Sequence, residues 1–249
     1  MQRAEVEALR SAEDSHWWHA TLRGLVLDVL EKCLPPGSRV LDAGCGTGGM
    51  LALLSNHPAA YSLEGIDQSE DAVRHCQGRG LTSVRAANVE DLPFEDNSFE
   101  AVLSLDVLYH TQVDEDKAVV EMKRVLRPGG LLLVNAAAFP CLRGRHDAAV
   151  CGARRYTIKR LRSLLEIHSL AVEFIHYWNA WLFVPLWIWR SWTRWFPGGR
   201  SDAGSELQLT TAWINRALKR PAMVDAKLCR DLKLPFGSSV LAVAKKRAR

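Results

Sequence analysis

A glycine-rich stretch preceded by an acid is the part of this sequence best suited to binding a ligand. Residues 41–49 read LDAGCGTGG, follow an apolar run, and place Gly44, Gly46 and Gly49 at the spacing G-x-G-x-x-G. Glycines between a strand and a helix let backbone N–H groups and the helix N-terminus approach a ligand with no Cβ in the way. A tight turn without a ligand is the alternative, but three glycines directly after a clear strand favour a ligand.

A second acid indicates that this ligand contains adenosine. Asp67, in EGIDQS, lies about 20 residues after Gly44, where a carboxylate accepts hydrogen bonds from both ribose hydroxyls. NAD and S-adenosylmethionine both carry such a ribose, so Asp67 does not distinguish them. Asp42 favours S-adenosylmethionine, because a carboxylate there attracts an ammonium group and repels a pyrophosphate.

The elements that position these residues are predicted to alternate between strands and helices from residue 40 to about 137, which is typical of a parallel sheet with crossover helices. An earlier helix is expected at 17–33, and Thr157 is expected to cap another that runs to about Ser169. Strands are expected near 39–43, 62–67, 83–89, 101–106, 131–136, 171–178 and 238–246, and further helices near 48–56, 69–77 and 114–126.

Four segments in this order resemble the class I S-adenosylmethionine-dependent methyltransferases: VLDAGCGTGG (40–49), GIDQSEDAV (65–73), NVEDLPFEDNSFEAVLSLDVLYH (88–110) and EMKRVLRPGGLLLV (121–134). The resemblance implies a Rossmann-like three-layer α/β sandwich whose seven-stranded, mostly parallel sheet has an antiparallel last strand. We expect one domain over 1–249, with parts at 1–36 (N-terminal helical cap), 37–137 (cofactor-binding core), 138–180 (substrate side), 181–236 (helical insertion or lid) and 237–249 (last strand and basic tail).

The resemblance also assigns cofactor contacts. Asp42, Gly44, Cys45 and Gly46 would line the methionine part, and Asp67 would hold the ribose, with Gln68 beside the adenine. Asn88 stands where the family often carries an aspartate for the adenine amino group, and its side-chain carbonyl can accept the same bond. The Val89 backbone would pair with the ring. Glu90, Leu105, Asp106 and His110 complete the expected set, with Leu105 and Asp106 at the sulfonium.

Two further stretches, SHWWHATLR and RHDAAVCGARRYT, resemble segments of a subset of these enzymes. Trp17 and Trp18 would cover the cofactor while Arg23 reaches its carboxylate; alternatively, both tryptophans only pack the first helix on the sheet. A general base is needed only if the acceptor is protonated at the working pH. Candidate catalytic residues are Tyr109, His110 and His146, and Tyr156 is a further residue that would orient the substrate.

Composition and motifs restrict the acceptor. A net charge of +4 is too mild to imply a nucleic-acid partner, and the Asn/Asp-Pro-Pro motif typical of amino-methylating nucleic-acid enzymes of this fold is absent after residue 105. We therefore expect a small, hydrophobic acceptor, with a lipid or prenyl acceptor presented at a membrane as the alternative. Six scattered cysteines without a C-x-x-C pair argue against a zinc site and against disulfides, so no metal and a reducing, cytoplasmic location are expected. The oligomeric state stays open.

A tryptophan-rich insertion separates the last two expected strands. Six of the nine tryptophans fall between Trp178 and Trp195. On a helix over 185–196, apolar residues including Ile188, Trp189 and Trp192 share one side and Arg190 lies opposite. Three interpretations are open: a helix packed in the core, a lid over an apolar substrate, or a peripheral helix at a membrane surface.

Overall fold

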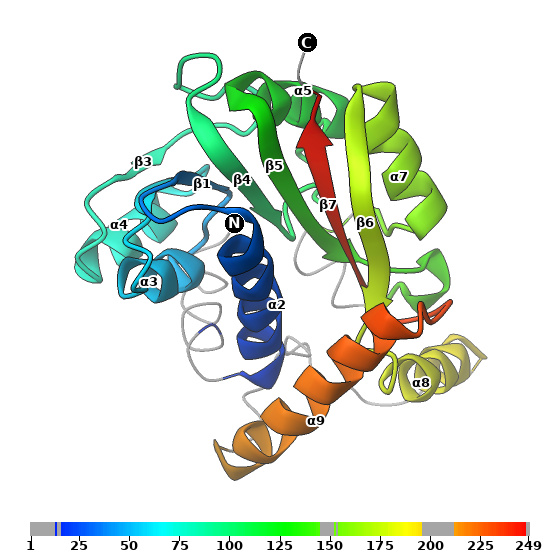
Figure 1. Cartoon of the computed structure of the whole chain (residues 1–249). Helices are drawn as coiled ribbons and strands as arrows, with labels where there is room; N and C mark the ends of the chain where they lie inside the picture. The colour runs from blue at the N-terminus through cyan, green and yellow to red at the C-terminus, as the bar shows by residue number, and fades with distance from the viewer. Residues whose placement is uncertain (1–12, 14–15, 145–151, 153, 196–211, 248–249) are drawn as a thin grey trace.

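The chain forms a single seven-stranded sheet covered by helices on both faces (Figure 1). The computed structural model describes residues 13, 16–144, 152, 154–195 and 212–247. The strands follow the order β3-β2-β1-β4-β5-β7-β6. Their bounds are β1 Arg39–Ala43, β2 Ser62–Asp67, β3 Val84–Ala86, β4 Phe99–Leu105, β5 Leu126–Ala137, β6 Leu170–Trp178 and β7 Ser239–Lys246.

Strand directions agree with the predicted fold class. The pairs from β3 through β5 are parallel, whereas β7 runs antiparallel to both β5 and β6. The predicted mostly parallel sheet with an antiparallel last strand is therefore confirmed. β5 begins at Leu126, earlier than predicted, because Leu126 already pairs with Phe99 before a register shift. The carboxyl ends of the parallel strands meet at one edge, where α/β proteins of this kind bind ligands.

Helices from distant parts of the sequence cover the two faces. α2 (Trp17–Cys33), α3 (Gly49–Ser55) and α9 (Ala212–Asp231) share one hydrophobic core cluster, and α5 (Glu115–Val125) and α7 (Ile158–Ile167) share another. α4 (Glu70–Gly78) packs near β3, and a short 3-10 helix, η1, spans Pro140–Leu142. Thr157 caps α7 as predicted, its hydroxyl accepting from the Arg160 N–H at 3.2 Å.

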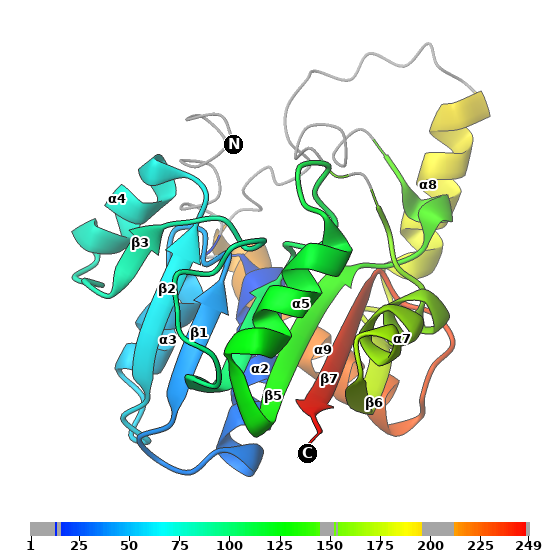
Figure 2. The same ribbon diagram turned by 90° about the horizontal axis from the view of Figure 1, so that it is seen from above.

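The insertion between β6 and β7 contains α8 (Phe183–Trp195) followed by α9. α8 lies at the edge of the sheet toward which β1 and β2 point (Figure 2). The interpretation of α8 as a helix packed in the core is wrong, because Ile188, Trp189 and Trp192 remain 55%, 49% and 64% exposed. Across the described residues, no helix has both the length and the apolar character needed to cross a membrane.

Candidate functional site

The glycine loop crosses the carboxyl ends of β1 and β2. The backbone N–H groups of Gly44 and Cys45 both donate to the Ile66 carbonyl oxygen at 2.8 Å. Gly44, Gly46 and Gly48 have φ values of 95°, 55° and 84°, a region that L side chains rarely adopt. The loop therefore depends on glycine at these positions for its shape.

Asp67 joins this loop to the end of β2. Its Oδ2 accepts from the Gly46 N–H at 2.9 Å and its Oδ1 accepts from the Ser69 N–H at 2.9 Å. Each carboxylate oxygen has a second lone pair and can accept one more hydrogen bond. The two sequence features that indicated adenosine are thus in direct contact, and Asp67 keeps acceptor capacity for a pair of ribose hydroxyls.

Asp42 lies beneath the loop in a buried position. The side chain is 2% exposed, and its Oδ1 has no hydrogen-bond partner among the residues described. Burial, reinforced by the negative charges of Glu13 and Asp67, raises the pKa of Asp42 from 3.8 to about 8. A buried acid with an unsatisfied oxygen fits a site that receives a cationic group, such as the ammonium of a methionine moiety.

Glu13 is a residue of this site that the sequence did not single out. Its Oε2 accepts from the Gly49 N–H at 3.0 Å and from the Thr47 hydroxyl, and the Arg23 guanidinium donates to the Glu13 backbone carbonyl. Burial raises the pKa of the Glu13 carboxyl. A Cβ at Gly49 would lie 3.0 Å from Arg23 Nη1, so the structure does bring Arg23 to the glycine loop. Glu13 belongs to no motif, so the sequence offered no signal for its contact with this loop.

The other expected adenosine contacts lie along the edge beside Asp67. Gln68 and Asn88 are exposed, and Val89 is buried. The Asn88 side-chain oxygen accepts from the Glu90 N–H at 3.0 Å, and Glu90 Oε1 accepts from the Asp114 N–H at 2.8 Å. Asn88 and Glu90 thus shape the turn that carries Val89 and hold it to the start of α5.

A hydrogen-bonded chain that starts from two buried side chains ends at the half-buried Asp106, the acid after β4. The Trp178 Nε1–H donates to Asn135 Oδ1 at 2.9 Å, and Asn135 Nδ2 donates to Asp106 Oδ2 at 2.9 Å. Since an indole can only donate, it fixes the Asn135 amide so that its NH₂ faces the carboxylate. Burial nevertheless raises the pKa of Asp106 to about 7, with the Asn135 bond acting in the opposite direction. Trp18 stacks on Trp178 with ring centroids 5.3 Å apart.

Asn135 and Trp178 are also residues that the sequence analysis missed. A single polar residue inside the apolar run LLLVNAA was the available signal for Asn135, since a buried amide requires partners. Trp17 gives the packing interpretation more support than the cofactor interpretation. It is buried, its N–H donates to Asn215 Oδ1 at 3.3 Å, and its ring lies 5.5 Å from that of Trp181.

Replacing Trp178 by phenylalanine is expected to lower the free energy of unfolding by about 2–4 kcal/mol, because Asn135 Oδ1 loses its donor and a cavity forms. The freed amide can turn its oxygen toward Asp106, so the pKa of Asp106 should rise further. Denaturant unfolding and the pH profile of turnover measure the two effects. Trp213→Phe is the control, because that side chain is 71% exposed. A pH profile that does not move would contradict the positioning role of Trp178.

The structure describes two of the three predicted catalytic residues, Tyr109 and His110. Tyr109 and His110 follow β4, and their rings stack with centroids 4.5 Å apart. Arg154 holds this segment by donating to the backbone carbonyls of Leu108, His110 and Val113 at 2.8–3.2 Å. Tyr156 is fully buried, and its one hydroxyl proton is shared between the Leu108 carbonyl and Glu115, so it supports the loop and does not have the substrate-facing position that was expected. His146 lies outside the described residues.

The fold is an α/β sandwich of Rossmann-like type with the glycine loop and Asp67 at its carboxyl edge, and the comparisons show which family it resembles. Residues 41–134 match a family model described as a methyltransferase domain. The chain is 42% identical over 103 residues to a phthiotriol/phenolphthiotriol dimycocerosates methyltransferase of Mycobacterium ulcerans, covering 39% of this chain and 36% of that protein. It is 36% identical over 107 residues to an Arabidopsis thaliana tRNA (carboxymethyluridine(34)-5-O)-methyltransferase, covering 42% of this chain and 25% of that protein.

Solved structures share the fold over most of the chain. A chain in a Haloferax volcanii complex with the Trm112 methyltransferase activator superposes with a TM-score of 0.64 and 18% identity, over 99% of this chain and 96% of that one. A geranyl diphosphate methyltransferase in complex with SAM gives a TM-score of 0.59 and 19% identity, over 92% and 85%.

Residues 41–134 form a methyltransferase domain that resembles those of the class I S-adenosylmethionine-dependent methyltransferases, as the sequence predicted, and the comparisons support S-adenosylmethionine as the cofactor. The matched stretches span only about a quarter to just over a third of the two curated relatives, whose names give different acceptors.

Proposed function

We propose that the protein transfers the methyl group of S-adenosylmethionine to a small, apolar acceptor by in-line displacement. The main support for this cofactor is the contact between the glycine loop and Asp67. Asp42 lies buried beneath the loop, and its Oδ1 has no hydrogen-bond partner among the described residues. When bound, the cofactor supplies a methyl group already activated on a sulfonium. Positioning and exclusion of water by the chain can then supply most of the rate.

Each side chain has a distinct proposed task. Asp67 holds the ribose, Asp42 receives the ammonium, and Arg23 lies near the glycine loop to bind the carboxylate. Asp106, with a pKa near neutrality, can take a proton from an acceptor that must lose one, and Asn135 holds it in place. His110 and Tyr109, which follow β4 after Asp106, are the candidates for contact with the acceptor.

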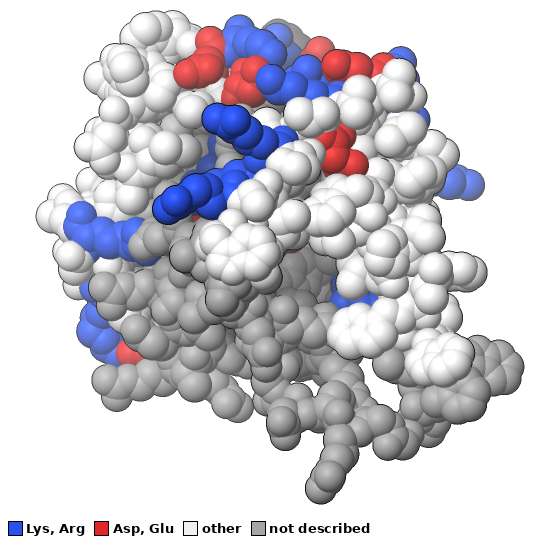
Figure 3. All heavy atoms as spheres, turned by 90° about the horizontal axis from the view of Figure 1, so that it is seen from below, with Lys and Arg blue, Asp and Glu red and all other residues white. Residues whose placement is uncertain are grey.

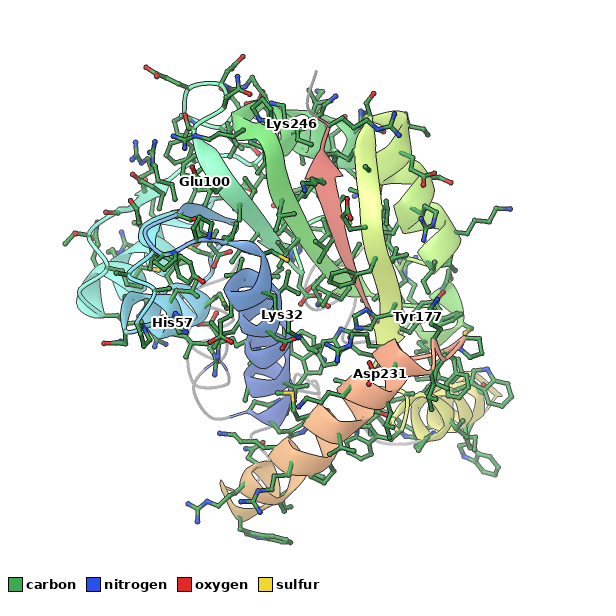
Figure 4. All side chains as sticks on the ribbon, in the orientation of Figure 1. Lys32, His57, Glu100, Tyr177, Asp231 and Lys246 are labelled. Atoms are coloured by element: carbon green, nitrogen blue, oxygen red, sulfur yellow. The ribbon has the colours of Figure 1, made fainter. Side chains whose placement is uncertain are left out.

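Aromatic side chains at the carboxyl edge support an apolar acceptor. Phe139, just after β5, lies 4.6 Å from Tyr177 and 5.1 Å from Phe183 between ring centroids, and Phe183 lies 5.5 Å from Phe236. Tyr177 stands near the end of β6 that adjoins α8 (Figure 4). Aromatic walls favour rings and hydrocarbon chains over phosphates. One similar protein is named for phthiotriol dimycocerosates, which are lipids, and another for geranyl diphosphate, which joins an apolar prenyl chain to a charged diphosphate.

Titration with S-adenosylhomocysteine and with NAD, followed by an acceptor panel, tests this proposal. We expect micromolar or tighter binding of S-adenosylhomocysteine and no response to NAD. Methyl transfer from labelled cofactor should appear with fatty-acyl, prenyl or aromatic acceptors. If the protein methylates tRNA in the panel but none of the apolar acceptors, the proposed acceptor class is wrong. We also propose a cytoplasmic location, on the basis of the scattered cysteines.

Cofactor affinity is expected to rise with pH up to about 8. In the ligand-free protein the Asp42 carboxyl is protonated below that value, whereas a bound ammonium favours the carboxylate. Binding at neutral pH should therefore release a proton, which calorimetry in buffers of different ionisation enthalpy measures. Asp42→Asn should remove Asp42's share of this release and weaken binding.

The same substitution should stabilise the empty protein as pH rises. An acid with a raised pKa in the folded state keeps its proton while the unfolded chain loses it, so Asp42 destabilises the fold increasingly from about pH 4 to about pH 8. The melting temperature of Asp42→Asn should exceed that of the wild type by more at pH 8 than at pH 5. A difference that is the same at both pH values would contradict the shifted pKa.

A further inference from the structure

Helix α8 is oriented with its apolar side outward. On the part of α8 with described side chains, 183–192, Arg190 is buried at 7% exposure beside Gly144, whereas every exposed residue is apolar. These exposed residues are Val184, Pro185, Trp187, Ile188, Trp189 and Trp192. A surface helix in water presents its charges outward, so the outer side of α8 is suited to a less polar environment.

The neighbouring surface is basic. The N–H groups of Ala180 and Trp181 donate to Asp225 at 3.0 and 3.2 Å, which fixes the segment leading into α8 to α9. α9 exposes Arg216, Lys219, Arg220 and Lys227 together with Trp213. Both acids of α9 already have partners. Asp225 accepts hydrogen bonds from the N–H groups of Ala180 and Trp181, and Asp231 pairs with Arg230. Figure 3, which views the molecule from below, shows Lys and Arg side chains, with some Asp and Glu among them, beside a broad area of uncharged side chains.

Tryptophan beside Lys and Arg is the composition of a helix that lies in a membrane interface. Indole rings favour the level of the lipid headgroups, and basic side chains are attracted to anionic lipids. The exposed stretch from Val184 to Trp192 rises only about 12 Å along the helix axis, which fits binding parallel to a surface. A second copy of the chain suits this face less well, because a symmetric contact would bring two basic α9 helices together.

We propose that the outer side of α8 and the basic side of α9 dock the protein on an anionic lipid bilayer, where an apolar acceptor reaches the cofactor site from the lipid. This rests on the proposed function, since α8 stands at the carboxyl edge of the sheet where that site lies (Figure 2). The ring contact of Phe139 with Phe183 connects this edge to the start of α8. The membrane would then both concentrate the acceptor and orient the enzyme toward it.

Flotation with vesicles tests the proposal on the full chain. The wild type should bind vesicles of phosphatidylcholine mixed with phosphatidylglycerol, and bind phosphatidylcholine alone more weakly. The double variant Trp187→Ser/Trp189→Ser should bind mixed vesicles at least about tenfold more weakly. Val120→Ser/Ile167→Ser is the matched control, because those apolar side chains are 48% and 74% exposed on α5 and α7. This control should bind as the wild type does.

A charge variant and two checks complete the design. Arg216→Glu/Lys219→Glu should lose the preference for anionic vesicles even if the tryptophan variant does not fold. Titration of every sample with S-adenosylhomocysteine separates the membrane proposal from the proposed function. If the protein binds the cofactor but not the vesicles, only the membrane proposal is overturned. Light scattering measures the oligomeric state. A dimer that the tryptophan variant dissociates, with no vesicle binding by the wild type, would assign this face to a second copy instead.

Discussion

Replacing Gly44 by alanine is expected to abolish measurable binding of S-adenosylhomocysteine and to lower the free energy of unfolding by about 3 kcal/mol. Two causes add at this residue. Its φ is 95°, which an L side chain rarely adopts, and a Cβ would lie 2.3 Å from Val107 Cγ2. The loop must move to relieve the contact, and the Gly44 and Cys45 bonds to Ile66 would then be strained or lost.

Two further variants separate these causes. Gly80→Ala is the matched control, because Gly80 has a φ of 82° but no atom within 4 Å of a new Cβ. Gly80→Ala should lower the free energy of unfolding by only about 1 kcal/mol and leave cofactor affinity unchanged. Adding Val107→Ala to Gly44→Ala removes the clash and should restore part of the stability. Calorimetric titration and denaturant unfolding give both quantities, and wild-type affinity in Gly44→Ala would refute the role assigned to the loop.

Asp67→Ala is expected to weaken S-adenosylhomocysteine binding at least about a hundredfold, the scale of two hydrogen bonds to a charged group. Asp67 also accepts from the N–H groups of Gly46 and Ser69, so its loss should loosen the glycine loop before any ligand arrives. We expect a fall of about 2 kcal/mol in the free energy of unfolding from those bonds.

Asp71→Ala is the control for this prediction. Asp71 is an acid on α4 that pairs with Arg74 on the same helix. Like Asp67→Ala, the Asp71→Ala substitution removes one negative charge. It should change cofactor affinity little and the free energy of unfolding by only about 0–1 kcal/mol, the contribution of a surface ion pair. If Asp67→Ala binds the cofactor as tightly as Asp71→Ala does, the assignment of Asp67 to the ribose is wrong.

Local sequence determined most of the elements and the cofactor class. Short apolar and β-branched runs predicted β1, β2, β6 and β7 within about one residue. The glycine spacing, Asp42 and Asp67 identified S-adenosylmethionine because those contacts need backbone shape and charge at fixed positions along a short stretch. Such information is contained in neighbouring residues, and so it can be read without the fold.

Tertiary structure alone decided which distant residues meet at the site and which side of α8 faces outward. Glu13 reaches Gly49 and Trp178 reaches Asn135 across long stretches of chain, and these contacts depend on how α2 and β6 pack on the sheet. Helical periodicity showed that Arg190 and Trp192 lie on opposite sides of α8, but it did not show which side faces outward. Packing near η1 and Gly144 buried Arg190 and left the tryptophans exposed, because a helix is oriented by its neighbours and amphipathicity fixes only the angle between its faces.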